Sequence, residues 1–277
     1  AHGGGCERSG MGGDVMDVYV CEDDFCSILS GIYDAGTSGR PSREQRLELK
    51  GQREPELFCR YLEVQPEKRK AESVMGTVRE RISGEACRLL WTASLSGDGE
   101  KADWMYRFLV DGFRQGPKIV HMLSLPSVFQ MVEYDRAVGN EAHLLTGFVR
   151  FARLPEGILA GSIGPKNDVL AIVAEHFEDR LSGENWMLWD EKRDKAAVHQ
   201  ANRETVLLRG IPEDIRRRIK AAGTQDPYGD LWRVFVHTIS IKERENRKCQ
   251  MTHLPLRFRE YMTEWQKTPC PPGMDMV

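Results

Sequence analysis

Residues 148–163, FVRFARLPEGILAGSI, decide the fold that the sequence predicts. In residues 148–153 apolar and basic side chains alternate, which is typical of a β-strand with one buried face. Gly157 permits a tight turn within residues 154–157, and a largely apolar run follows over residues 158–163. The stretch therefore predicts a hairpin of two antiparallel strands.

Beyond this hairpin the sequence predicts a helix and three more strands. Pro165 and a following Asn167 or Asp168 open a helix over residues 169–181. The predicted strands after it are residues 185–190, 196–200 and 205–208. Trp186 and Trp189 stand three apart in the first of these strands, so they lie on opposite faces of it.

The chain before the hairpin predicts a short strand and then mostly helices. Residues 17–21 are β-rich, and either Asp23 or Asp24 can cap a helix over residues 25–35. Residues 36–56 are rich in glycine, proline, serine and charge and predict a long mobile connection to a strand at residues 57–64. Apolar residues then recur every three or four positions through residues 66–147.

These elements predict an α+β fold. A mostly antiparallel sheet, built from strands near residues 17–21, 148–163 and 185–208, packs against helical N-terminal and C-terminal segments over residues 66–147 and 212–266. We expect one domain over residues 16–266, with division into two lobes as the alternative. The expected termini of this domain are a glycine-rich leader or tag over residues 1–15 and a frayed tail over residues 267–277.

Composition excludes several classes of protein. The 277 residues carry a formal net charge of −3 and a mean hydropathy of −0.48, so the chain is neither a polycation nor disordered. Its apolar runs, such as residues 169–174, are far shorter than the roughly 18 residues that cross a bilayer. These short runs predict that the protein does not enter membranes. Seven scattered cysteines without a CxxC pair predict reduced thiols in a cytoplasmic protein.

The strongest signal for a binding partner lies near the C-terminus. Residues 209–260 contain twelve Lys and Arg against seven Asp and Glu, an excess of five positive charges. The candidate phosphate contacts are Lys242, Arg244, Arg247, Lys248, Arg257 and Arg259, with Phe258 and Tyr261 as aromatic neighbours. The alternative is a solvated helix face, on which Glu243, Glu245 and Glu260 pair with these cations.

A second set of residues suggests a pocket for a phosphate or carboxylate ligand. Its members are His143, Arg150, Arg153, His176, Arg180 and Arg193. His176 and Arg180 stand four apart and share one helical face, so they can reach toward the same anion. The alternative is structural: hydrogen-bonded core histidines, and arginines that pair with Glu141, Asp179 or Asp190.

A third set offers an enzymatic hypothesis. Asp168, Asp190, Glu191 and Lys192 partly follow the acidic and lysine pattern of metal-dependent nucleases, in which such groups hold Mg²⁺ and a water. Pro165 and Asp168 are not adjacent as that pattern requires, and a helix N-cap also explains Asp168. The favoured prediction is therefore no metal and no cofactor.

Three longer stretches together resemble an uncharacterised bacterial family, usually labelled "probable DNA metabolism protein". They are residues 138–151 (VGNEAHLLTGFVRF), residues 176–193 (HFEDRLSGENWMLWDEKR), and residues 239–246 with 255–264 (ISIKEREN, PLRFREYMTE). The resemblance covers residues 16–265 in the same order.

The resemblance implies association with a radical S-adenosylmethionine protein of DNA repair or modification, and with uracil-DNA glycosylases to which the domain is found fused. This chain lacks the CxxxCxxC cluster motif of the radical enzymes and any glycosylase active-site motif. We therefore expect an accessory protein of DNA metabolism that binds DNA or the radical enzyme, with a metal-dependent nuclease or other hydrolase as the alternative.

Overall fold

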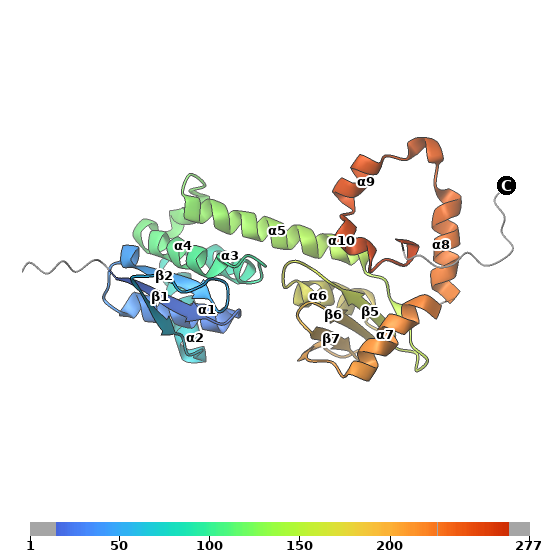
Figure 1. Cartoon of the computed structure of the whole chain (residues 1–277), viewed down its shortest axis with the longest axis horizontal. Coiled ribbons are helices and arrows are strands. Elements are labelled where there is room, and N and C mark those ends of the chain that lie inside the picture. The colour runs from blue at the N-terminus through green and yellow to red at the C-terminus, as the bar shows by residue number, and fades with distance from the viewer. Residues whose placement is uncertain (1–14, 226, 266–277) are drawn as a thin grey trace, which may run out of the picture. The chain divides into compact units, whose positions relative to one another are not determined.

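The structure is a computed structural model that describes residues 15–225 and 227–265. The expected tail and all but Val15 of the expected leader lie outside the described residues. The chain has the α+β fold that the sequence predicts, and it forms two compact units that divide between Ala137 and Val138. Figure 1 shows each unit with its own sheet.

The first unit is built on a three-stranded parallel sheet in the order β2-β1-β3. Its strands are β1 (Met16–Cys21), β2 (Gln45–Leu49) and β3 (Cys59–Glu63). Its helices are α1 (Phe25–Thr37), α2 (Lys68–Arg81), α3 (Gly84–Ser94) and α4 (Lys101–Gln115), with the 3-10 helices η1 (Ser42–Glu44) and η2 (Gly116–His121). Helix α5 (Pro126–Phe148) begins in this unit and ends in the second.

This parallel sheet corrects two predictions. Strand β1 pairs with β2 and β3 and does not join the strands beyond residue 148. The expected mobile connection over residues 36–56 contains β2, in which Gln45, Leu47 and Leu49 are buried on one face. The other face carries the ion pair of Arg46 with Glu48, and such charges made this segment resemble a loop.

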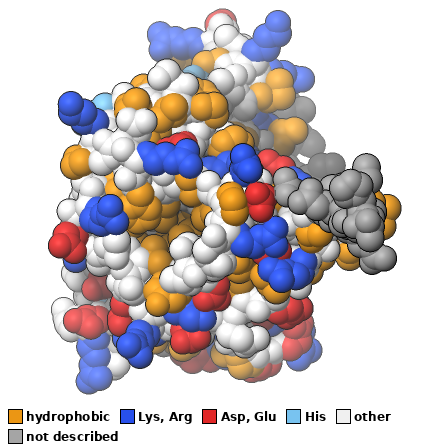
Figure 2. Space-filling view, turned by 90° about the vertical axis from the view of Figure 1, so that its left-hand side faces the viewer, with side chains coloured by type: hydrophobic (Ala, Val, Ile, Leu, Met, Phe, Trp, Pro, Cys, Tyr) orange, Lys and Arg blue, Asp and Glu red, His pale blue; other side chains and the backbone are white. Residues whose placement is uncertain are grey.

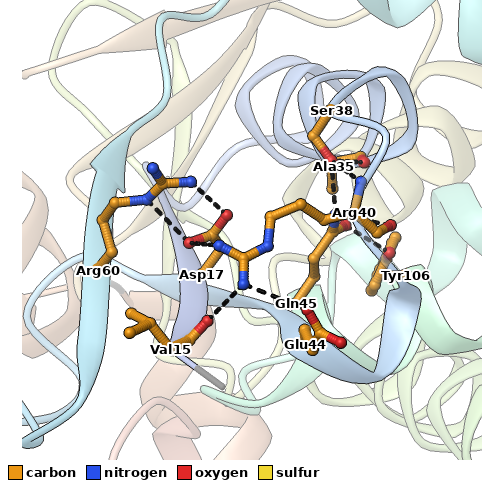
Figure 3. Close-up of polar contacts among 9 residues, drawn as sticks. All are labelled: Val15, Asp17, Ala35, Ser38, Arg40, Glu44, Gln45, Arg60 and Tyr106. Carbon is orange, nitrogen blue, oxygen red and sulfur yellow. Dashed lines mark hydrogen bonds and ion pairs between the residues drawn. The ribbon is translucent and has the colours of Figure 1, made fainter. Parts of the chain in front are cut away.

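A buried carboxylate ties the first unit together at the start of β1. Asp17 is 0% exposed and receives Arg60 Nε at 2.9 Å, Arg60 Nη2 at 2.6 Å and Arg40 Nη1 at 3.2 Å. Arg40 also donates to the carbonyl of Val15, and Tyr106 of α4 donates to the buried Gln45 side chain (Figure 3). These contacts neutralise the carboxylate and join β1, β3 and the chain after α1.

Helix α1 begins as the sequence predicts and packs closely on β1. Asp24 caps it by accepting the N–H of Ser27 at 2.9 Å. Gly31 on its buried face has no room for a side chain, because a Cβ there would lie 2.6 Å from Cys21 Sγ. Burial raises the pKa of Cys21 to about 12, so this sulfur stays a neutral, packed thiol.

The second unit contains a five-stranded mixed sheet in the order β4-β5-β6-β7-β8. Its strands are β4 (Ala152–Arg153), β5 (Leu159–Ile163), β6 (Trp186–Asp190), β7 (Lys195–His199) and β8 (Val206–Arg209). The pair β5 and β6 is parallel and the other pairs are antiparallel. One sheet thus contains both strands of the predicted hairpin and residues 186–190, as expected.

The helical elements of this unit follow the predicted order. They are α6 (Leu170–Arg180), α7 (Glu213–Gln225), α8 (Pro227–Ile239), η3 (Lys242–Arg244), α9 (Arg247–His253), α10 (Leu256–Arg259) and η4 (Thr263–Trp265). Helix α6 packs against β6 and β7, and α7 packs against β4 and β5. Among the described residues, no helix combines the length and the apolar character that crossing a bilayer requires.

The predicted hairpin forms with a shorter first strand. Gly157 takes a φ of 84° in the turn, and the N–H of Leu154 donates to the carbonyl of Ile158 at 2.8 Å. Helix α5 continues through Phe148, so the strand predicted from residue 148 is reduced to β4. Arg150 lies in the connection between α5 and β4. Local alternation could not show that the helix overruns the start of the predicted strand.

The two tryptophans of β6 lie on opposite faces, as the sequence predicts. Trp186 stacks on His199 with ring centroids 5.2 Å apart and contacts Phe177 of α6. Trp189 lies under α7, where Lys220 stands 5.4 Å from its ring centroid. Both rings are therefore part of the core.

The contact of α1 with β1 generates a stability test. Gly31→Ala places a methyl group against Cys21 Sγ and should lower the free energy of unfolding by about 1–3 kcal/mol through overpacking. Gly36→Ala in the same helix meets nothing within 4 Å and should be neutral or stabilising by up to about 1 kcal/mol. Urea denaturation measures the free energy of unfolding of both variants. Cys21→Ala should rescue Gly31→Ala in part, and equal effects of the two glycine substitutions would contradict the packing described.

Candidate functional site

Polar groups gather where the two parallel strands of the second unit end. Glu141 of α5 is 2% exposed, and its carboxylate accepts the N–H of Lys166 at 2.9 Å and the N–H of Asn167 at 2.7 Å. Asn167 Nδ2 donates to the same carboxylate at 2.8 Å, and Arg257 Nη2 of α10 lies 3.2 Å from it. Glu141 therefore joins α5, the loop after β5 and the C-terminal segment.

The loop after β6 is held by a second buried carboxylate. Asp190 is fully buried, and its Oδ1 accepts the N–H of Lys192 at 3.0 Å. Burial raises the pKa of Asp190, and the nearby Arg193 partly opposes this shift. Arg193 in turn donates to the carbonyls of Pro165 and Lys166, so this candidate anion-binding residue ties the two loops together.

The residues of the nuclease hypothesis are engaged in separate contacts. Asp168 pairs with Lys195 and does not cap α6, whose N-cap is Val169. Glu191 pairs with Lys220 at 3.2 Å. Within residues 15–225 and 227–265, no three His, Cys, Asp or Glu side chains come together as a metal ion would require.

The second predicted set is spread over several elements. His143 on α5 and both His176 and Arg180 on α6 are exposed. Arg150 forms a two-point contact with Glu264, with Nη2 2.7 Å from Oε1 and Nε 3.3 Å from Oε2. The remaining members, Arg153 and Arg193, lie in the β4–β5 hairpin and the loop after β6, where Arg153 donates to the carbonyl of Gly157.

A cavity of about 260 Å³ opens beside Arg150. Its polar lining includes Arg150, Ser162, Glu191, Lys220, Glu260 and Tyr261. Burial raises the pKa of Tyr261, and the carboxylates of Glu191 and Glu260 raise it further. Because Glu264 and Glu191 neutralise the two cations of this lining, the cavity offers a mixed polar surface and not a strong anion site.

Tyr261 also requires a glycine next to it. A Cβ on Gly164 would lie 2.1 Å from the tyrosine hydroxyl oxygen, so the ring packs directly on the backbone after β5. This contact fixes α10 and the following turn against the sheet.

Five of the six candidate nucleic-acid contacts fall into two groups. Arg244, Arg247 and Lys248 are exposed, and Arg247 pairs with Glu245 at 3.3 Å. The backbone of Lys242 belongs to η3, and its side chain lies outside what the structure describes. The other two are structural: Arg257 pairs with Glu141, and Arg259 stacks 4.0 Å from the ring centroid of Trp265.

Helix α8, which precedes these cations in the chain, carries a large exposed apolar surface that the sequence did not predict. Its exposed members are Tyr228, Leu231, Trp232, Val234, Phe235 and Ile239. The rings of Trp232 and Phe235 lie 5.7 Å apart, and Arg150 stands 5.5 Å from the Trp232 ring centroid. Aromatic spacing at residues 228, 232 and 235 was the available signal, but such a stripe ordinarily predicts a buried face.

The face of the first unit that Figure 2 shows carries side chains of both charges. Figure 2, drawn from the side of this unit, shows basic and acidic side chains interspersed with apolar ones. Its cavity of about 260 Å³ is lined by cations and carboxylates, and Arg53 pairs there with Glu100 at 2.5 Å. A surface with balanced positive and negative charges does not favour the binding of a polyanion.

Comparison with known families finds a match over much of the chain. The model of a family described as "Domain of unknown function (DUF4130)" matches residues 99–264, which is more than half of the chain. No curated protein and no solved structure matches the chain.

The stability of two variants tests which candidate cations are structural and which are only exposed. Arg257→Ala removes a charged partner from buried Glu141 and should lower the free energy of unfolding by about 1.5–3 kcal/mol. Lys248→Ala, on the exposed segment, should change it by less than about 0.5 kcal/mol. Chemical denaturation measures both, and equal values would contradict the structural role of Arg257.

Proposed function

The chain belongs to the DUF4130 family, and we propose that this member is a non-catalytic accessory protein of DNA metabolism that binds nucleic acid through its C-terminal helices. The resemblance of its longer motifs to the "probable DNA metabolism protein" family supports the biological setting. The exposed cations of η3 and α9 support the mode of binding.

The proposal rests on the exposure of these cations, two of which have no acidic partner among the described residues. In the described part of the chain, the side chains of Arg244 and Lys248 have no acidic partner, although Glu243 and Glu245 are close in sequence. Long, solvated cations of this kind contact phosphates without a fixed pocket, and each contact releases a condensed counterion. An acidic protein with one locally basic segment binds a polyanion through that segment.

Removing Lys242, Arg244, Arg247 and Lys248 together, each as alanine, should weaken nucleic-acid binding. Fluorescence anisotropy with a labelled oligonucleotide measures affinity at several salt concentrations. The slope of log K against log salt should flatten by about 0.7–0.9 for each phosphate that the variant no longer neutralises. The melting temperature should stay close to that of the wild type, because Arg244, Arg247 and Lys248 are exposed and exposed side chains contribute little to stability.

A matched control removes four exposed cations from the first unit. Arg43, Lys68, Arg79 and Arg136, each as alanine, change the net charge by the same amount. This control should keep its affinity and salt slope. Equal losses of affinity in both quadruple variants would show that net charge alone acts, and a wild type without nucleic-acid affinity would refute the proposal.

A second candidate function is docking to a protein, for which strand β8 provides the observation. This strand is an edge of the sheet, and its Val206, Leu207 and Leu208 are exposed. An edge with unpaired backbone groups and apolar side chains accepts a strand from another protein. The resemblance implies a radical S-adenosylmethionine protein as that partner.

Gel filtration of the two purified proteins, after nuclease treatment, tests this candidate. The wild type should form a complex, and Leu207→Lys should raise the Kd about tenfold or more, because a charge enters the apolar contact. A complex that forms equally well with Leu207→Lys would exclude β8 as the docking strand.

A further inference from the structure

Helix α8 carries its aromatic side chains on one face. At 100° per residue, Tyr228, Trp232 and Phe235 fall within about 60° of one another around the helix axis. They are 73%, 39% and 49% exposed. Three large rings thus share one exposed face of a single helix.

The rest of the unit covers this face only in part, at Trp232, where Arg150 lies against the ring. The part of α8 that contacts the rest of the unit includes Gly229, which is buried, and Val236, which is half-buried. Asp230, an acid of this helix, pairs with Arg233 on the side away from the rings. The aromatic face therefore carries no carboxylate of its own helix.

We propose that the aromatic face of α8 binds the unpaired bases of single-stranded nucleic acid, while Arg244, Arg247 and Lys248 contact its phosphates. The inference rests on the nucleic-acid binding proposed above and assigns it a class of substrate. The negative charge of a nucleic acid complements these cations, which follow α8 in the chain. A nucleic acid is therefore the partner that fits both the aromatic face and the cations.

Stacking explains the choice of single strands. The bases of a duplex are stacked on one another, so their faces are closed to protein rings, whereas unpaired bases stack readily on aromatic side chains. Successive rings on α8 are separated along the axis by about 6 and 4.5 Å, which suits consecutive bases of an extended strand. Arg150, placed 5.5 Å from the Trp232 ring centroid, holds that ring in position.

The test compares a labelled 20-nucleotide oligothymidylate with a duplex of the same length, using the full chain and fluorescence anisotropy. The single strand should bind at least about tenfold more tightly. Phe235→Ala should weaken its binding at least about fivefold, the lower end of what one stacked base contributes. Phe235→Leu keeps an apolar side chain and should weaken it similarly, whereas Phe235→Tyr keeps the ring and should restore binding.

A control variant and a second readout separate stacking from other effects. Phe129→Ala, on a phenylalanine of α5 that is 53% exposed, should leave affinity unchanged. Binding of the single strand should also quench tryptophan emission in the wild type more than in Trp232→Phe.

Three outcomes would overturn the inference. Equal affinity for single strand and duplex, with Phe235→Leu unaffected and the quadruple cation variant impaired, would leave the proposed function standing and remove the stacking. A change of oligomeric state in Phe235→Ala without a change in affinity would assign the face to a second copy of the chain. Absence of binding to either oligonucleotide would remove the proposed function as well.

Discussion

The second unit depends on one buried carboxylate, that of Glu141. A carboxylate withdrawn from water is stable only when its oxygens receive enough donors, and Glu141 obtains them from Lys166, Asn167 and Arg257. The donors come from the loop after β5 and from α10, so one side chain fixes both against α5. The C-terminal chain is thereby anchored by α7 before it leaves the sheet and by α10 after it returns. Figure 1 shows α8 and α9 between these anchors.

The elements of the second unit could largely be predicted from the sequence, because their signals are local. Gly157 marks the turn, and the tryptophans of β6 mark a strand buried on both faces. The parallel sheet of the first unit could not be predicted in the same way. A parallel strand pairs with a segment beyond a crossover and leaves no turn signal, and in β2 the charges of Arg46 and Glu48 hid the alternation.

The candidate site was predictable in composition but not in arrangement. An excess of basic residues near the C-terminus is visible in the sequence, whereas the pairing of Arg257 with Glu141 spans more than a hundred residues and appears only in the fold. The stripe at Tyr228, Trp232 and Phe235 has helical spacing, but spacing alone cannot tell whether a face meets the core or solvent. Exposure is a property of the assembled unit.

The contact of Gly164 with Tyr261 constrains how this chain can evolve. Since a Cβ at position 164 would reach the tyrosine hydroxyl, no side chain can be accepted there until the ring has been replaced by something shorter. Losing the ring first would open a void beside the sheet. Each order of change passes through a less stable intermediate, so the two positions are expected to vary together among relatives. They would form a covarying pair that links the end of β5 to the turn after α10.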